Sequence, residues 1–367
     1  MADQRSDSES DDIDSVALVR NDSSSSTLDD EELVFRIAMI NPARRRGRGG
    51  AMGNSGSTAP APLGKTHVPD LEWKVHDFSA LLETKATSAI SALFHCSGYN
   101  WCLLLTPKHK QDDKENLYVA LSLMISKGDL EQGQTMHAVF ELSIFNNSNG
   151  MYCGYKASYN FAFNNAQSKK ECLIPLQELL KSSAFLVDDS CVFGVEILKI
   201  DVSSPEKKAV VVQKKATTVQ NLFVQKKGFI KGTYTWTINN FLELDSQNFV
   251  RSPTFEVGGH KWYIGMYPHG ERRSTDCLAL GLYLESLDEL FIESRKVVQI
   301  TLSILDQKTG KYFTRTTDLL VCTHREGWGW FNFLPLKELQ GMSRGYLIES
   351  KCVLKADFTI FGSSNDG

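Results

Sequence analysis

Apolar residues alternate with polar or small residues along much of the chain beyond residue 70. In 278–284 (LALGLYL) and 299–305 (QITLSIL), every second side chain is apolar, which is the period of a half-buried strand. In the second half of the chain, runs of this kind predict strands at Tyr234–Ile238, Phe255–Val257, Lys261–Tyr267, Leu278–Leu284, Val297–Leu305, Leu319–Cys322 and Lys351–Phe361. So many short strands within about 130 residues predict an antiparallel β-sandwich.

Turn signals separate these runs. Asp306–Gly310 (DQKTG) and Val257–Trp262 (VGGHKW) are typical of hairpins in which glycine takes a positive φ. Only Leu336–Gly341, directly after Pro335, is expected to form one or two helical turns.

The pattern occurs twice. Five ordered pairs of segments match at offsets of 163, 161, 160, 160 and 161 residues, namely 71–78 with 234–241, 94–107 with 255–268, 140–152 with 300–312, 174–179 with 334–339, and 185–197 with 346–358. A nearly constant offset indicates two copies of one domain. We place the copies at 70–202 and 230–363, joined by a linker at 203–229.

The first 66 residues have a different composition. Residues 1–40 carry a net charge of −8, residues 41–65 carry +5, and the rest of the 367-residue chain carries −1. The Ser- and Asp-rich start and the Gly/Ser/Ala/Pro stretch before residue 66 predict a disordered tail, because they offer little apolar surface to bury. Within it, Leu33–Ile40 (LVFRIAMI) is an apolar island suited to docking. Four arginines at 44–48 allow a weak nuclear signal or an RNA contact, but without interleaved aromatics they are a poor RNA footprint, and nucleic-acid binding is not favoured.

Composition also predicts the compartment. The chain begins without a secretory signal pattern and has no run of 18 apolar residues. Its eight cysteines are scattered and form no CxxC pair, which favours buried thiols over disulfides or a zinc ribbon. We therefore expect a cytoplasmic or nuclear protein with no membrane contact. The Lys-Lys pairs of the linker allow a nucleic-acid or acidic-lipid contact, but a solvated connector with Leu222–Val224 against a neighbouring sheet is favoured.

The second copy resembles the meprin-and-TRAF-homology (MATH) domain. The resemblance rests on Tyr234–Phe241 (YTWTINNF), Phe255–Trp262 (FEVGGHKW), Tyr267-Pro268, Leu302–Leu305 (LSIL) and Trp328–Trp330 (WGW). The first copy looks like a diverged MATH domain, and the tandem is most similar to plant TRAF-like proteins. The resemblance implies two all-β sandwiches of the TRAF/MATH type. It also implies that the protein binds short extended peptides of partners, including components of ubiquitin ligases or deubiquitinases.

The same resemblance implies a peptide-binding site. Residues 327–330 (GWGW) stand where the family has an Asp-Trp-Gly-Phe segment, and glycine at 327 removes the carboxylate. The expected groove residues are Trp328, Trp330, Gly329, Tyr283, Ile300 and Leu320, with Gly281 as an alternative to Tyr283. The two tryptophans are two positions apart, so they share a strand face and a core role is the competing interpretation. The first copy has no tryptophan in its equivalent stretch, 164–170 (NNAQSKK).

No catalytic motif stands out. The eight histidines are scattered, and neither a GxSxG nor a P-loop motif is present. Asp188-Asp189 is the best carboxylate pair, but a turn is the favoured interpretation. We expect a non-catalytic adaptor with no cofactor and no metal. The alternatives are an enzyme of the ubiquitin-protease lineage and a nucleic-acid-associated protein that uses the basic tail. The sequence leaves the partner, its motif and the oligomeric state open.

Overall fold

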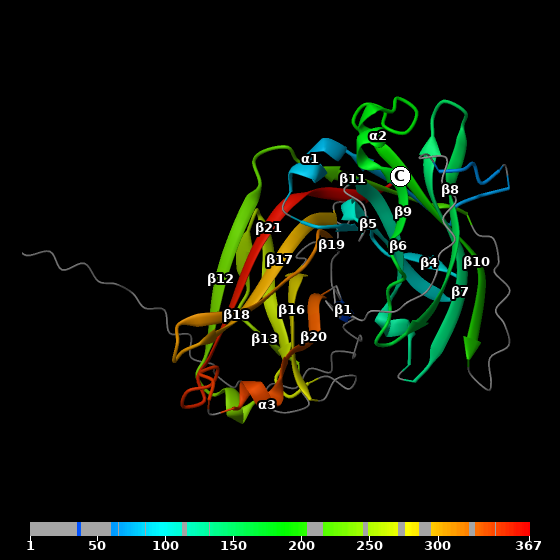
Figure 1. Cartoon of the computed structure of the whole chain (residues 1–367). Coiled ribbons are helices and arrows are strands. Elements are labelled where there is room, and N and C mark those ends of the chain that lie inside the picture. The colour runs from blue at the N-terminus through cyan, green and yellow to red at the C-terminus, as the bar shows by residue number, and fades with distance from the viewer. Residues whose placement is uncertain are drawn as a thin grey trace, which may run out of the picture. The chain divides into compact units, whose positions relative to one another are not determined.

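The computed structural model describes residues 35–37, 60–64, 66–84, 86–111, 116–131, 133–203, 216–244, 249–270, 276–285, 295–322, 327–341 and 343–367 (Figure 1). Most of the predicted tail, including its Arg44–Arg48 run, lies outside these residues, as do the linker lysines at 207–208 and 214–215. From the tail, the structure describes the backbone of β1 (Phe35–Ile37) and the residues that lead into the first copy.

The first copy is built almost entirely from strands. Its elements are β2 (Leu71–His76), α1 (Phe78–Glu83), β3 (Ala89–Ile90), β4 (Phe94–Cys96), β5 (Tyr99–Lys110), β6 (Leu117–Ile125), η1 (Lys127–Asp129), β7 (Thr135–Asn146), β8 (Met151–Ala162), β9 (Glu171–Pro175), α2 (Leu176–Lys181) and β10 (Cys191–Ser203).

The second copy confirms each of the seven predicted strands and the short helix. Its elements are β12 (Ile230–Ile238), η2 (Phe241–Glu243), β13 (Val250–Arg251), β14 (Phe255–Val257), β15 (His260–Tyr267), β16 (Cys277–Glu285), β17 (Arg295–Asp306), β18 (Lys311–Thr316), β19 (Leu320–Cys322), β20 (Gly327–Pro335), α3 (Leu336–Leu339) and β21 (Cys352–Asp366). The strand prediction omitted β13, β18 and β20. Of these, β18 is polar at most positions and β20 is apolar on both faces, so neither shows a clean alternation.

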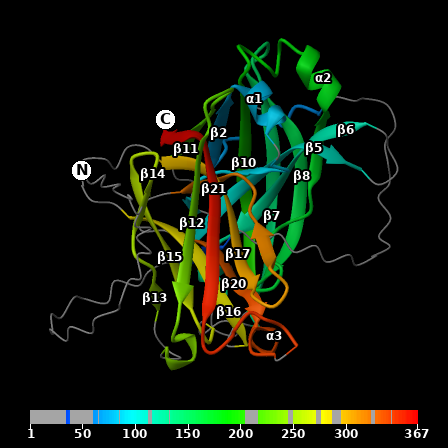
Figure 2. The same cartoon turned by 90° about the vertical axis from the view of Figure 1, so that its left-hand side faces the viewer.

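Each copy has one sheet of its own, and the two copies share a third sheet. The first copy has the sheet β3-β5-β6-β9 and the second has β1-β20-β16-β15-β13, while a ten-stranded sheet runs β18-β17-β21-β11-β2-β10-β7-β8. The strand that joins the copies is β11 (Thr218–Val224), which lies within the expected linker (Figure 2). It pairs in parallel with β2 and antiparallel with β21.

Two apolar side chains of β11 belong to the core, while Phe223 is 36% exposed. Leu222 and Val224 are 0% and 1% exposed and pack in the same cluster as Trp73 and Phe193 of the first copy. That cluster also contains Val297 and other apolar residues of the second copy. The two sandwiches therefore share buried apolar surface as well as a sheet.

The repeats keep the same internal hydrogen bonds. Trp101 donates its indole N–H to the carbonyl of Cys96, and Trp262 donates in the same way to Val257, both at 3.2 Å. Both rings are 0% exposed. These matched contacts explain why the tryptophan landmarks recur at a fixed offset, since a buried indole needs both a cavity and an acceptor.

A second matched contact closes the opposite end of each copy. The peptide N–H groups of Phe78 and Ser79, in α1, are bound by the carbonyl and carboxylate oxygens of Asp189 at 2.8 and 2.9 Å. At η2, Ser350 binds the N–H groups of Phe241 and Leu242 through its carbonyl and hydroxyl oxygens, both at 2.9 Å. The pair Asp188-Asp189 therefore forms a turn, as favoured, with φ of 48° and 57°.

The described helices are all short. None of the helices within the described ranges is long and apolar enough to span a membrane. All eight cysteines fall in the described part as thiols, and seven of them are buried, as their apolar surroundings predicted.

Candidate peptide-binding edge

Strand β20 carries the segment expected to bind a peptide. It pairs antiparallel with β16 on one side, with Leu282 opposite Trp328 and Gly281 opposite Gly329. On its other side it pairs with β1 of the tail, in parallel. Without β1, β20 would be the outermost strand of its sheet and would present a row of unpaired backbone N–H and C=O groups.

The two tryptophans of β20 face the interior of the sandwich. Trp328 and Trp330 are 3% and 4% exposed and belong to the apolar cluster that also holds Ile300 and Leu320, each 0% exposed. The structure thus brings four of the six predicted site residues together from strands of two facing sheets. They meet as packed side chains. Among the described residues, the indole N–H of Trp328 has no hydrogen-bond partner.

Tyr283 lies on the opposite face of the β16–β20 sheet. It is 0% exposed and packs with Tyr263 and Phe331. The rings of Tyr263 and Tyr283 are stacked with centroids 4.9 Å apart, and the Arg251 guanidinium lies 3.9 Å from the centre of the Tyr263 ring. The sheet therefore separates the side chain of Tyr283 from the two tryptophans of the predicted site.

The position of Tyr283 leaves no room for a carboxylate side chain at residue 327. Tyr283 lies opposite Gly327 across the strand pair, and a Cβ atom built at residue 327 would come within 2.1 Å of the Tyr283 ring. An aspartate would not fit there while the tyrosine holds this place. The glycine at 327 and the tyrosine at 283 form a complementary pair.

Gly329 has a comparable steric role. A Cβ atom at this residue would lie 2.0 Å from the carbonyl oxygen of Leu280 and 2.4 Å from the Cα atom of Gly281. Because Gly329 has no Cβ atom, β20 can approach β16 closely at the position between Trp328 and Trp330. Gly281, the alternative to Tyr283 in the sequence analysis, thus lies beside Gly329 in the strand pairing.

The first copy contributes side chains to the same cluster. Ile90, Leu104 and Met124 are at most 6% exposed and pack in the cluster of Trp328 and Leu320. The backbones are also bonded, because Ile90 donates its N–H to the carbonyl of Leu319 at 2.9 Å. The apolar side of the predicted groove is therefore covered from within the chain.

Asp318 fastens this contact between the copies. Its Oδ1 accepts hydrogen bonds from the Thr87 hydroxyl at 2.6 Å and from the Ser88 N–H at 3.1 Å. The residue is 3% exposed, and Oδ2 has no hydrogen-bond partner within the described ranges. Burial raises the pKa of this carboxyl, although the Thr87 hydrogen bond and the nearby Lys170 oppose the shift. The sequence analysis missed Asp318, because an isolated aspartate before a strand carries no signal of a distant partner.

The equivalent edge of the first copy lacks these features. Strand β9 pairs with β6, and the stretch 164–170 before it forms turns and isolated bridges. No tryptophan or glycine pair marks β9, as the sequence predicted for this copy.

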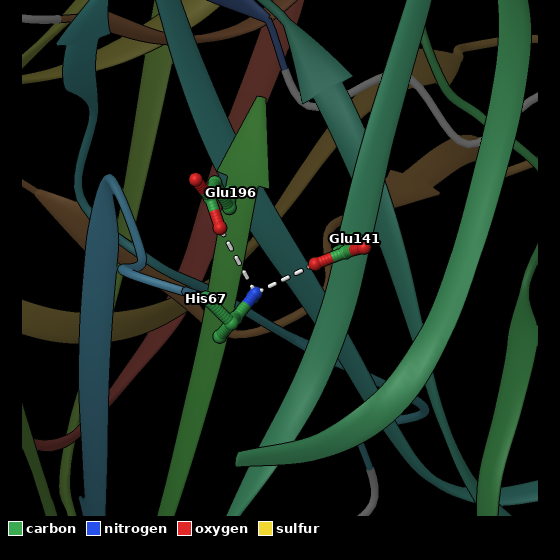
Figure 3. A group of neighbouring side chains, drawn as sticks. All are labelled: His67, Glu141 and Glu196. Atoms are coloured by element: carbon green, nitrogen blue, oxygen red, sulfur yellow. Dashed lines mark hydrogen bonds and ion pairs between the residues drawn. The ribbon is translucent and has the colours of Figure 1, made fainter. Parts of the chain in front are cut away.

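A second polar cluster lies where the chain enters the first copy (Figure 3). The Nδ1 atom of His67 is 2.8 Å from Glu141 and 3.1 Å from Glu196, and its Nε2 atom is 3.1 Å from the hydroxyl of Ser143. The backbone N–H of Val68 donates to the same Glu196 oxygen at 3.0 Å. The sequence analysis did not single out these residues, which are far apart along the chain.

These three side chains could in principle hold a metal ion, since their ligand atoms lie within 4.8 Å of one another. The contacts of the His67 ring have hydrogen-bond lengths, and they join residue 67 to Glu141 and Ser143 of β7 and to Glu196 of β10. The cluster therefore holds the entering chain against β7 and β10.

The chain was compared with known proteins. The family model described as "MATH domain" matches residues 70–197 and 233–358, which together make up more than two thirds of the chain. The chain belongs to the MATH domain family. The two matched regions agree with the two copies found in the sequence, and MATH domains are protein-interaction modules.

Individual relatives match this tandem MATH protein over about one domain. It is 31% identical to "Ubiquitin C-terminal hydrolase 12" of Arabidopsis thaliana over 40% of its own length and 13% of that protein. It is 33% identical to "TNF receptor-associated factor homolog 1b" of the same plant over 35% of its own length and 12% of that protein. A solved structure of "Notothenia coriiceps TRAF5" has 19% identity and a TM-score of 0.27, covering 35% of this chain and 72% of that one. The chain thus spans about an eighth of the length of these two plant relatives.

Proposed function

We propose that this tandem MATH protein is a non-catalytic adaptor that binds an extended segment of a partner along the side of β20 that faces away from β16. The observation that carries the proposal is the pairing of β20 with a strand from outside its own domain, β1. A sheet edge that accepts one extended segment has the backbone geometry to accept another. Main-chain hydrogen bonds would then supply affinity.

The predicted side-chain site enters this proposal in a modified form. Since Trp328, Trp330, Ile300 and Leu320 are buried, the partner would contact mainly the β20 backbone at Gly327–Gly329. The buried tryptophan side chains would support the β20 backbone by packing against the core.

The proposed partners are proteins with short linear motifs. The relatives named as a ubiquitin hydrolase and as a TNF receptor-associated factor homolog support the proposal that they belong to ubiquitin-dependent turnover or signalling. The alternative of a ubiquitin-protease enzyme is less well supported, because the hydrolase is matched over 13% of its length. A ubiquitin–fluorophore turnover assay separates the two, since cysteine-dependent turnover by the purified chain would contradict the adaptor.

The edge itself is tested by selection of peptides and hydrogen exchange. A displayed library of random eight-residue peptides is selected on the full chain and on a chain with residues 33–40 replaced by Gly and Ser. We expect selected peptides to slow amide exchange in 327–335, while exchange in the equivalent strand 171–175 stays unchanged. Peptides that protect only other strands, or a selection that enriches nothing on either chain, would refute the proposal.

A further inference from the structure

The side of β20 that faces away from β16 is paired with the chain's own tail. Phe35 lies opposite Gly327, Arg36 opposite Trp328 and Ile37 opposite Gly329, in parallel register. The three pairs span Gly327–Gly329 at the start of β20, and Figure 1 shows β1 beside β20. The tail strand thus occupies the stretch of edge that the proposed function assigns to a partner.

We propose that the tail segment Leu33–Ile40 is a resident ligand of the β20 edge, and that partners bind by displacing it with a similar segment in parallel orientation. This inference rests on the proposed function and adds to it the regulation of the site and the chemistry of the partner. The partner segment is a short apolar strand with at most one basic residue, as in LVFRIAMI.

The composition of the tail favours this segment over its neighbours as a strand. Residues 29–32 (DDEE), directly before it, carry four adjacent acidic side chains, which are depleted in strands. Pro42, two residues after the island, has no N–H to donate to a ladder. The apolar island between them is therefore the part of the tail that is suited to strand pairing.

The connection to the first MATH domain suits an intramolecular ligand. Residues 38–59 join β1 to the described chain at Pro60, and most of them are Gly, Ala, Ser, Asn, Pro or Arg. This composition is typical of flexible linkers, as the sequence analysis expects for this part of the tail. A flexible linker of about twenty residues holds its ligand at an effective concentration on the order of 1 mM.

This concentration sets the expected size of the effect. If the isolated segment binds with a Kd on the order of 100 μM, tethering keeps the edge mostly occupied and weakens any competitor by about tenfold. The site is thus closed to weak ligands and open to those that bind more tightly than the tail.

The experiment uses three full-length chains. One is the natural chain, one has residues 33–40 replaced by Gly and Ser, and the control has Val16–Val19 (VALV) replaced in the same way. The control removes an apolar stretch from the same tail and leaves the paired segment intact. The probe is a fluorescent synthetic peptide with the sequence of residues 33–40, and binding is followed by anisotropy.

We expect the peptide to bind the 33–40 variant about tenfold more tightly than the other two chains. Among the amides of 327–329, those whose N–H groups face away from β16 should exchange fast in that variant alone and should slow again when the peptide is added. Equal binding to all three chains, or no binding to the 33–40 variant, would refute the resident ligand. Library peptides that still protect β20 in that case would leave the proposed function standing.

Light scattering with size-exclusion chromatography tests whether the segment pairs within one chain. The inference expects the same mass for all three variants. A natural chain that is oligomeric, and becomes monomeric only when residues 33–40 are replaced, would show exchange between copies and contradict a ligand held within one chain.

Discussion

The two MATH domains share one framework but differ in what lies beside their edge strands. The indole hydrogen bonds of Trp101 and Trp262 are the same in length and partner type. The carbonyl groups of Asp189 and Ser350 accept equivalent main-chain hydrogen bonds at 2.8 and 2.9 Å. By contrast, β2 of the first domain pairs with β11, whereas β12, the counterpart of β2 in the second domain, pairs only with β21 among the described strands. Contacts that define the fold are thus repeated, whereas contacts at the edges differ.

This difference shows how duplicated domains can diverge. Edge strands are where another chain segment can be added without rebuilding the core. In the first domain the added strand is β11, which connects the two domains and buries Leu222 and Val224. In the second domain it is β1, a short strand whose pairing with β20 covers three residues.

The largest effect is expected at the tryptophans of β2 and β12. Trp73 lies between β10 and β11 and is 0% exposed, whereas its counterpart Trp236 is half-buried. Trp73→Ala should cost about 3–5 kcal/mol of unfolding free energy, and Trp236→Ala about 1–2 kcal/mol because less apolar area is lost. Urea unfolding measures both.

A matched pair serves as the control for that comparison. Trp101→Ala and Trp262→Ala remove equally buried rings with equivalent hydrogen bonds, so their costs should agree within about 1 kcal/mol. Equal costs at Trp73 and Trp236 would mean that β11 does not account for the difference between the domains.

A smaller effect is expected at the contact between the domains. Asp318→Ala leaves the Thr87 hydroxyl and the Ser88 amide without their acceptor and should cost roughly 1–3 kcal/mol. Asp318→Asn keeps an oxygen acceptor and removes the buried charge, so it should cost less. Thermal unfolding at neutral pH ranks the two variants, and the reverse order would contradict the assigned role of Oδ1.

The pH dependence tests the charge of Asp318 separately. Burial raises the pKa of this carboxyl in the folded chain, so the folded state binds the proton more tightly than the unfolded state does. Its stabilising contribution is complete below the unfolded pKa of about 3.9 and is lost as the pH rises through the raised value. Between acid and neutral pH the natural chain should therefore lose stability relative to Asp318→Asn, and parallel stability curves would refute this.

The smallest effect concerns the two turns that close the domains. Burial raises the pKa of Asp189, but hydrogen bonds from Ser79 and the charge of Lys226, 3.1 Å away, lower it overall. The carboxylate therefore stabilises the fold above its unfolded pKa, and this stabilisation is lost as the pH falls through the lowered value. Asp189→Asn should cost roughly 0.5–1 kcal/mol at neutral pH, with the difference vanishing in acid.

The second domain offers the matched control for this turn. Ser350→Gly removes the hydroxyl acceptor of Leu242 while the positive φ of 66° stays favourable for the new residue. Its cost should be a few tenths of a kcal/mol and should be the same in acid and at neutral pH. A pH-dependent cost at Ser350 would show that the Asp189 result does not arise from the carboxylate.

The sequence alone determined the repeat, the all-β class and seven strands of the second domain, because alternation along a strand and glycine in a tight turn are local features. It also singled out Leu33–Ile40 as an apolar island and residues 327–330 as a site. It left undecided whether Trp328 and Trp330 face a groove or the core, since the spacing of two residues fits both.

Only the tertiary structure decided what covers each edge. Three contacts depend on residues that are far apart along the chain. Ile90 and Leu104 pack against the predicted groove, β11 pairs with strands of both domains, and β1 pairs with β20. Strand edges are chemically alike along their backbones, so their pairing is set by which segment the fold brings near. No pattern within a single strand contains that information.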